Sequence, residues 1–153
     1  MRSGAEDLRI HARLIDGLYV EAMVLADEAR TYFDDGGRAE RDGLTPMLRV
    51  GFSCESLKVT TRLMHVIAWL LTQRAVLAGE LAATDALDPS RRLGTAPLSD
   101  PVLVEQLPLA ARALVATSAD LHRRVARLDD AQTRSAPADS PARHMLSRLA
   151  AAF

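Results

Sequence analysis

The chain has 153 residues, of which 48% are hydrophobic and only 4% aromatic. This predicts one domain with a core of leucine, alanine, valine and methionine, a composition that favours helices over a β-sandwich. The net charge of −1 argues against a general nucleic-acid-binding protein, and no apolar run approaches the length that spans a bilayer.

The first expected helix runs from about Leu8 to Phe33, where apolar residues recur at steps of three and four along one face. The sequence Asp34-Asp35-Gly36-Gly37 is expected to end it, because glycine takes the left-handed conformation common at helix C-termini. The polar residues from Arg38 to Gly43 are expected to form a loop.

The central helix is expected between about Leu44 and Ala83, with Thr45-Pro46 at its start and Gly79 as a candidate end. Its apolar residues form two rows. One row is Leu57, Met64, Leu71 and Ala78, and the other is Val59, Leu63, Val66, Leu70 and Leu77. The rows together span roughly 200°, so we expect this helix to bury both of them between two neighbouring helices.

Residues 84–99 contain Pro89, Gly94 and Pro97, and are therefore predicted to form a loop that crosses from one bundle end towards the other. Asp100-Pro101 could start a short turn. The third long helix is expected from Pro108, because leucines recur there every seven residues. These are Leu107, Leu114, Leu121 and Leu128, with Ala111, Ser118 and Val125 between them.

The sequence thus predicts an all-α fold: an antiparallel three-helix bundle in residues 1–131, followed by a flexible C-terminal tail in residues 132–153. Residues 133–141 are rich in Ser, Ala and Pro and are expected to be disordered. A helix from Ala142 to Phe153 could follow, although it would be too short to be stable alone. Its apolar side would carry Met145, Leu146 and Leu149.

The polar sector of the central helix carries the candidate partner-binding residues, which follow one another at steps of three and four. They are Lys58, Arg62, His65, Trp69 and Gln73, and we call them the docking ridge. Tryptophan and arginine are frequent anchors of protein interfaces, which favours a surface that binds another protein. Two alternatives stay open: a dimer interface, or a capped bundle edge in which Trp69 lies over a neighbouring helix and the basic residues are solvated.

Patterns typical of metal sites are weak in this sequence. The four histidines have no ligand partner at helical spacing stronger than an aspartate four residues before the first of them. They are His11, His65, His122 and His144. Glu21 and Glu28 lie seven residues apart but lack the Glu-x-x-His partners of a carboxylate-bridged bundle, so we interpret them as solvated.

The single cysteine, Cys54, cannot form an internal disulfide, and the N-terminal residues lack the apolar stretch of a signal peptide. Both features fit a reducing cytoplasm. Lys58, one turn away, could activate the Cys54 thiol, but a small buried side chain is the favoured interpretation. We expect no catalytic residue, metal or cofactor and hence no enzyme; a thiol-dependent enzyme centred on Cys54 is the alternative.

Several segments match a known pattern. They include Glu55 to Met64 (ESLKVTTRLM), Trp69-Leu70-Leu71 and Gln73-Arg74-Ala75-Val76, continuing to Gly79-Glu80, and the part from about Thr60 to Val76 is the most specific. Tyr19 to Met23, Ala29 to Asp34 and Leu121 to Asp129 add to them, so the likeness covers about residues 15–130. These segments resemble the RcdA family, regulators of CtrA degradation.

The resemblance implies a three-helix bundle able to form a dimer, in the cytoplasm of an alphaproteobacterium and at its cell pole. It implies a non-catalytic adaptor that helps the ClpXP protease degrade cell-cycle regulators. The implied partners are ClpX primed by a response regulator, a cyclic-di-GMP-responsive protein and protein cargo, with no nucleic acid and no membrane insertion. The alternative function is a structural bundle whose docking ridge mediates only self-association.

The end of the chain, Leu149-Ala150-Ala151-Ala152-Phe153, resembles the apolar, alanine-rich C-termini that ClpX-type unfoldases grip. An ordinary alanine-rich terminus is the favoured interpretation of these residues. A linker that leads to a short apolar segment would nevertheless suit a tethering module, because linker length sets the effective concentration at the target.

Overall fold

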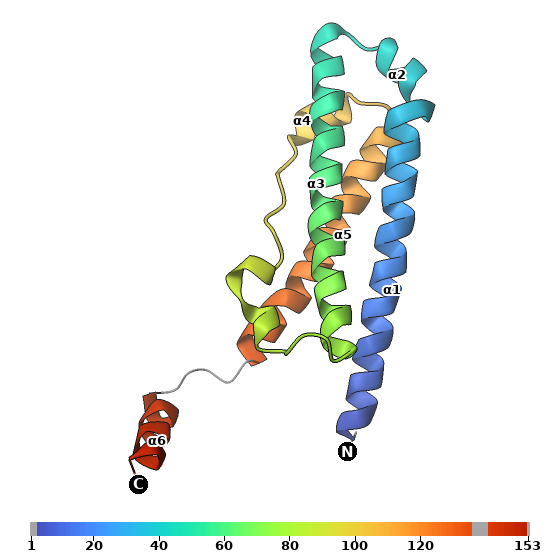
Figure 1. The fold of residues 1–153 in the computed structure, drawn as a ribbon. Helices are drawn as coiled ribbons and strands as arrows, with labels where there is room; N and C mark the ends of the chain where they lie inside the picture. Colours follow the sequence, from blue (N-terminus) through green and yellow to red (C-terminus); the bar gives the residue numbers. More distant parts are fainter. Residues whose placement is uncertain (1–2, 136–140, 153) are drawn as a thin grey trace.

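A computed structural model describes residues 3–135 and 141–152, and the regular secondary structure in these ranges is entirely helical. Three long helices lie side by side: α1 (Gly4–Thr31), α3 (Pro46–Leu77) and α5 (Leu109–Ser135) (Figure 1). The short helices are α2 (Arg38–Asp42), α4 (Pro101–Glu105) and α6 (Pro141–Ala151). The predicted all-α class is therefore confirmed.

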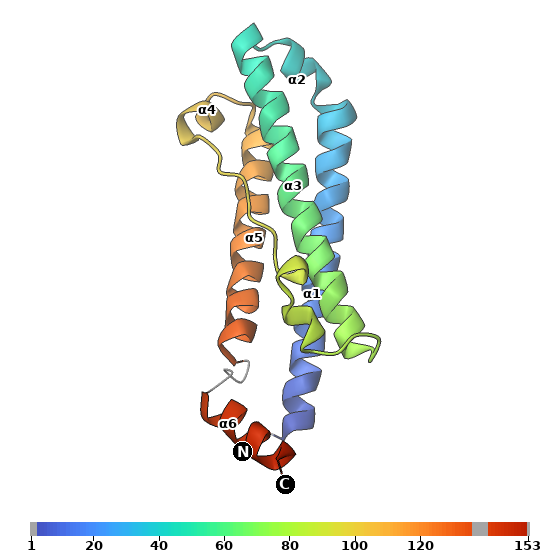
Figure 2. The ribbon, with the colours of Figure 1, turned by 60° about the vertical axis from the view of Figure 1, so that its left-hand side comes forward.

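The directions of the long helices differ from the predicted antiparallel bundle. Contacts between α3 and α5 advance together along both helices: Arg62 with Ser118, Trp69 with Asp129, and Gln73 with Gln132. The two helices are therefore parallel, and only α1 runs against them (Figure 1). The cause is the crossover segment, residues 78–108, which returns the chain along the bundle to the end where α3 began (Figure 2).

The end of α1 differs from the expected glycine stop. The helix passes into a π-helical turn, Tyr32–Gly36, and Gly37 has a φ of −89°, so neither glycine supplies a left-handed C-cap. Gly37 is needed for space instead, because a Cβ there would lie 2.8 Å from Tyr32 Cζ. Residues 38–42, expected as a loop, form α2.

The limits of α3 agree with the sequence signals. Thr45 Oγ1 accepts a hydrogen bond from the Leu48 amide, and Pro46 occupies the first turn. The helix ends at Leu77, short of the expected Ala83, and Gly79 has a φ of +76°, the left-handed conformation that favours glycine. Thr45-Pro46 and Gly79 are thus confirmed as the boundary signals.

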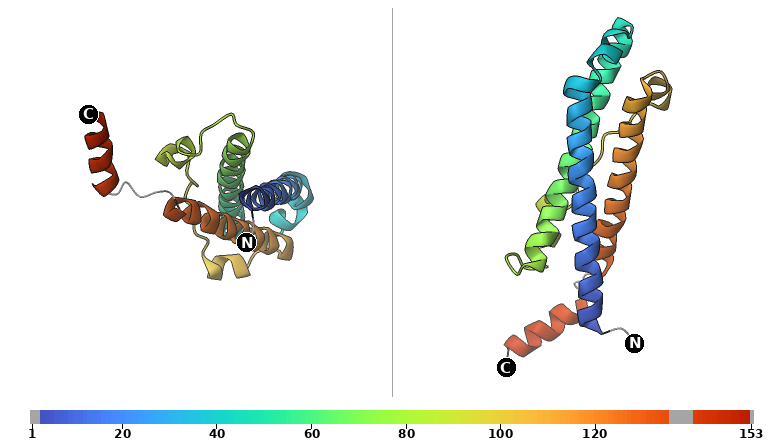
Figure 3. Two further views of the ribbon diagram at one scale, coloured as in Figure 1. Left: turned by 90° about the horizontal axis from the view of Figure 1, so that it is seen from below. Right: turned by 90° about the vertical axis from the view of Figure 1, so that its right-hand side faces the viewer.

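The core lies between the three long helices, which surround it in the view along the bundle (Figure 3). The heptad of α5 faces inward as predicted. Leu107, Ala111, Leu114, Ser118, Leu121 and Val125 are buried, and Leu128 is half-buried. From α3, four residues of one predicted row join them: Val59, Leu63, Val66 and Leu70. The fifth, Leu77, is 38% exposed, so its predicted burial is wrong.

The other predicted row of α3 lies outside the core, and its predicted burial is wrong. Leu57 is 66% exposed, Met64 63% and Leu71 48%. Its place inside is taken by the side of the helix that carries Arg62 and Trp69, both 2% exposed. The polar groups of Arg62 and Trp69 find partners on α5 and on the crossover segment, so the burial of these two side chains does not leave them unpaired.

The C-terminal region was expected to be flexible from residue 132. Helix α5 instead continues to Ser135, and residues 136–140 of the expected disordered stretch lie outside the described residues. Helix α6 (Pro141–Ala151) forms close to the expected short helix. Met145, Leu146 and Leu149 are exposed. The division into a bundle domain and a tail remains a prediction.

Candidate functional site

Most of the docking ridge is interior. Arg62 and Trp69 are 2% exposed and Gln73 is 4% exposed, whereas Lys58 and His65 are half-buried. An exposed ridge is therefore the wrong prediction. The capped-edge alternative is confirmed for Trp69, which lies against α5, but not for Arg62, which is buried and not solvated.

Trp69 joins α3 to α5 and to the crossover segment. Its Nε1–H donates to Asp129 Oδ1 at 3.0 Å, while Asp129 Oδ2 accepts from Arg92 Nη2 at 2.9 Å. The indole ring belongs to the apolar core, so the side chain combines a buried apolar body with one satisfied donor. Asp129 accordingly holds the three elements together.

Arg62 and Glu55 form a buried charged pair bridged by the crossover segment. The Ser99 hydroxyl accepts from Arg62 Nη2 at 2.7 Å and donates to Glu55 Oε2 at 2.5 Å. Arg62 also donates to the Pro97 carbonyl at 2.8 Å, and Lys58 Nζ donates to Glu55 Oε1 at 3.0 Å. Burial lowers the pKa of Arg62, and the negative charge of Glu55 opposes that shift.

Two imidazoles hold the next part of the crossover segment. His65 Nδ1 donates to the Thr95 carbonyl at 3.0 Å, and His122 Nε2 donates to the Gly94 carbonyl at 2.8 Å. Gly94 lies so close to α3 that a Cβ would be 2.6 Å from His65 Nδ1. Both histidines therefore act as structural donors that bind the backbone.

Replacing Gly94 with alanine is expected to lower the free energy of unfolding by about 1–3 kcal/mol, because the new methyl group overlaps the His65 ring. Thermal and urea unfolding would measure the loss. The matched control is Gly17→Ala on α1, where nothing lies within 4 Å of the added Cβ. That change is expected to stabilise the helix by about 0.5–1 kcal/mol. Equal effects of the two changes would contradict the close packing.

The outer face of α3 carries an apolar stripe that no described part of the chain covers. Its residues follow one another at alternating steps of four and three. They are Val50, Cys54, Leu57, Thr61, Met64, Ala68, Leu71 and Ala75. Thr61 and Ala75 are half-buried, and the other six are exposed. The spacing is that of the seam of a coiled coil, and none of these side chains is charged. Exposed apolar surface of this extent is typical of protein-binding sites.

Cys54 belongs to this stripe and is exposed, so its predicted burial is wrong. Lys58, the residue that could activate its thiol, donates to buried Glu55. The Lys58 ammonium group is therefore bonded to Glu55.

Glu21 is not simply solvated either. It forms an ion pair with Arg124 of α5, which also pairs with Asp120 at 3.0 Å.

Among the described residues, no three or more His, Cys, Asp or Glu side chains are grouped so that they could hold a metal ion. In residues 3–135 and 141–152, no helix has the length and apolar character needed to cross a membrane.

Comparisons with known proteins place the chain in a family. A family model described as "Protein of unknown function (DUF1465)" matches residues 7–153, and no curated protein matches the chain. Among solved structures, the chain is similar to RcdA from Caulobacter crescentus CB15, with a TM-score of 0.64. The match covers 78% of this chain and 90% of that one. With the family model over almost all residues and 33% sequence identity to this relative, the chain belongs to the RcdA family.

Proposed function

We propose that this protein is a non-catalytic adaptor that promotes degradation of cell-cycle regulators by the ClpXP protease. The observation that carries the proposal is 33% sequence identity to RcdA over 90% of that chain. The adaptor works in the cytoplasm and at the cell pole. Its partners are ClpX with its primer response regulator, a cyclic-di-GMP-responsive protein and protein cargo.

The apolar stripe is the surface that we assign to partner binding. It presents large apolar side chains at heptad spacing: Val50, Leu57, Met64 and Leu71. An amphipathic helix can lay its own apolar residues against such a seam, so the stripe fits a helical segment of a partner protein. The buried docking ridge supports this surface from inside, because its contacts hold α3 with the stripe outward.

Charged substitutions in the stripe are expected to weaken binding without unfolding the bundle. Leu57→Glu and Met64→Glu place a carboxylate where an apolar partner would dock, and both sites are already more than half exposed. We expect each to reduce cargo degradation by primed ClpXP by about tenfold or more, because removing a central anchor costs at least about 2 kcal/mol of binding. Reconstituted degradation and pull-down with ClpX, primer and cargo would measure the effect.

The matched control is Leu98→Glu, which changes an 88% exposed leucine on the crossover segment. It is expected to leave both assays unchanged. If all three variants deliver cargo at the normal rate, the stripe is not the docking surface. Absence of binding to ClpX, primer and cargo by the unchanged protein would overturn the adaptor function itself.

A structural bundle that only associates with itself is the second candidate, and the seam-like spacing of the stripe favours it specifically. Sedimentation at several concentrations separates the candidates. Monomeric stripe variants that still support full cargo turnover would favour self-association as the role of the stripe. Arg62 and Trp69 are unsuitable for this test, because substitutions at these buried residues alter folding as well.

A further inference from the structure

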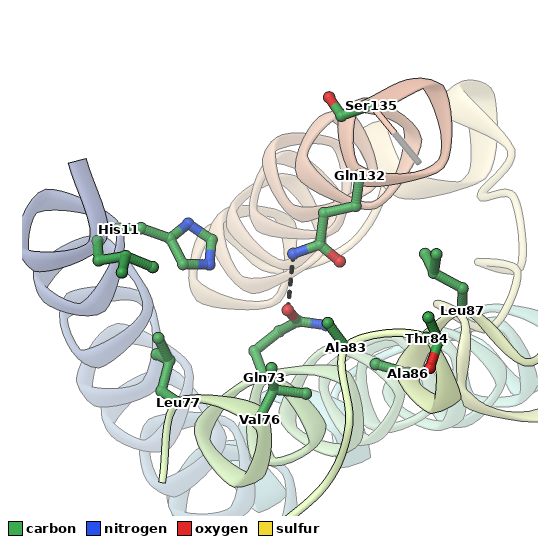
Figure 4. Close-up of a pocket in the computed structure, with 11 residues that line it drawn as sticks. His11, Gln73, Val76, Leu77, Ala83, Thr84, Ala86, Leu87, Gln132 and Ser135 are labelled. Carbon is green, nitrogen blue, oxygen red and sulfur yellow. Dashed lines mark hydrogen bonds between the residues drawn. The ribbon is translucent and has the colours of Figure 1, made fainter. Parts of the chain in front are cut away.

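A pocket of about 360 Å³ opens where α3 and α5 end and α1 begins (Figure 4). Its walls are largely apolar and include Leu8, Val76, Leu77, Ala83, Ala86 and Leu87. Leu8 is 62% exposed and Leu77 38% exposed, so two of these leucines are incompletely covered. We call this site the end pocket.

One polar group in the wall of the end pocket lacks a partner. Gln73 is buried, and its Oε1 accepts from Gln132 Nε2 at 2.6 Å. Its own Nε2 has no hydrogen-bond partner among the described residues, and it points toward Ala83 (Figure 4). A buried donor is normally paired. The end pocket therefore suits an apolar segment that also brings one oxygen acceptor.

Helix α6 has both properties. Met145, Leu146 and Leu149 are exposed, and their spacing puts them on one side of the helix. The last four carbonyls of an α-helix have no partner within the helix, so the final turn of α6 also offers acceptors.

Chain length keeps α6 close to the end pocket. Ser135, the last residue of α5, lines the pocket, and five residues separate it from Pro141, the first residue of α6. Six virtual bonds between these Cα atoms span at most about 22 Å. The first residue of α6 thus stays within that distance of Ser135, which raises the local concentration of α6 at the end pocket.

We propose that α6 binds in the end pocket of its own chain, covering Leu77 and Leu8 with Met145, Leu146 and Leu149, while a carbonyl of its last turn accepts from Gln73 Nε2. The contact is independent of the apolar stripe and goes beyond the proposed adaptor function. An amphipathic helix of another protein that matches the same apolar face would compete for the end pocket.

Amide hydrogen exchange of the full chain, followed by mass spectrometry, tests the contact. A helix as short as α6 is marginal by itself, so binding in the end pocket should slow exchange of its amides by about tenfold or more over an unprotected peptide. Leu77→Glu is expected to abolish this protection. Leu71→Glu, a change at a comparably exposed leucine outside the pocket, is expected to preserve it. Circular dichroism and thermal unfolding would verify that both variants fold.

The reverse change, Leu146→Glu, should accelerate exchange in the pocket wall around residues 83–87. Unprotected exchange of α6 in the unchanged protein would overturn the proposal, and so would protection that survives Leu77→Glu. Protection that rises with protein concentration would also overturn it, because the bound helix would then come from a second copy.

Discussion

Replacing Trp69 with alanine is expected to lower the free energy of unfolding by about 3–5 kcal/mol. The indole is 2% exposed in the main core, so its removal leaves a large cavity between α3 and α5. It also takes away the donor that Asp129 Oδ1 accepts from at 3.0 Å. Urea denaturation followed by circular dichroism would measure the change, since Trp69 is the only tryptophan and its fluorescence is lost with it.

The control is Trp69→Phe, which keeps an aromatic ring in the core but removes the Nε1–H donor. We expect a loss of about 1.5–3 kcal/mol, the size typical for a hydrogen bond to a charged group. A loss below about 1 kcal/mol in Trp69→Ala would mean that this side chain is accessible to water. In that case the docking ridge would return as a candidate surface.

The elements that could be predicted from sequence are those defined by local signals. The three long helices follow from apolar residues at steps of three and four, and the limits of α3 follow from Thr45-Pro46 and Gly79. Each signal acts within one or two turns of helix. The π-helical turn after α1 and the short helix α2 carry no comparable apolar period, so the sequence predicts a helix end and a loop in their place.

The inward face of α3 could not be predicted from α3 alone. Its rows span so much of the helix that either side could face the core. The choice depends on partners far away in sequence: Asp129 for Trp69, and Ser99 with Ser118 for Arg62. One residue does indicate the inward face: a tryptophan among polar residues is typical of a helix side whose polar groups form hydrogen bonds inside the fold. The other side of the helix carries no charge from Val50 to Ala75 along the apolar stripe.

These polar contacts explain why α3 and α5 run parallel in one register. The crossover segment extends along α3 and contributes the Ser99 hydroxyl and the carbonyls of Gly94, Thr95 and Pro97 as partners for Arg62, His65 and His122. A shift of α5 by one turn would separate Trp69 from Asp129 and leave a buried carboxylate without its donor. Register and the outward direction of the apolar stripe thus have the same physical origin.

Replacing Arg62 with methionine is expected to destabilise the fold by about 3–5 kcal/mol, because it removes a buried cation that donates to Pro97 and Ser99 and whose charge offsets that of buried Glu55. Glu55 is completely buried and would lose the cation that faces it across Ser99. The Pro97 carbonyl would lose its donor as well. Thermal and urea unfolding would measure the loss, and amide exchange of residues 95–100 would show whether the crossover segment detaches.

Lys58→Met is the matched control, because it also removes a positive charge that bonds to Glu55. The Lys58 side chain is 29% exposed, so its pairing is partly screened by water and its loss should cost less than that of Arg62, about 1 kcal/mol. The double change Arg62→Met with Glu55→Gln should recover part of the stability, since it removes the stranded charge. Additive losses in the double variant would show that the two buried groups act independently, and the crossover segment would then be held mainly by His65 and His122.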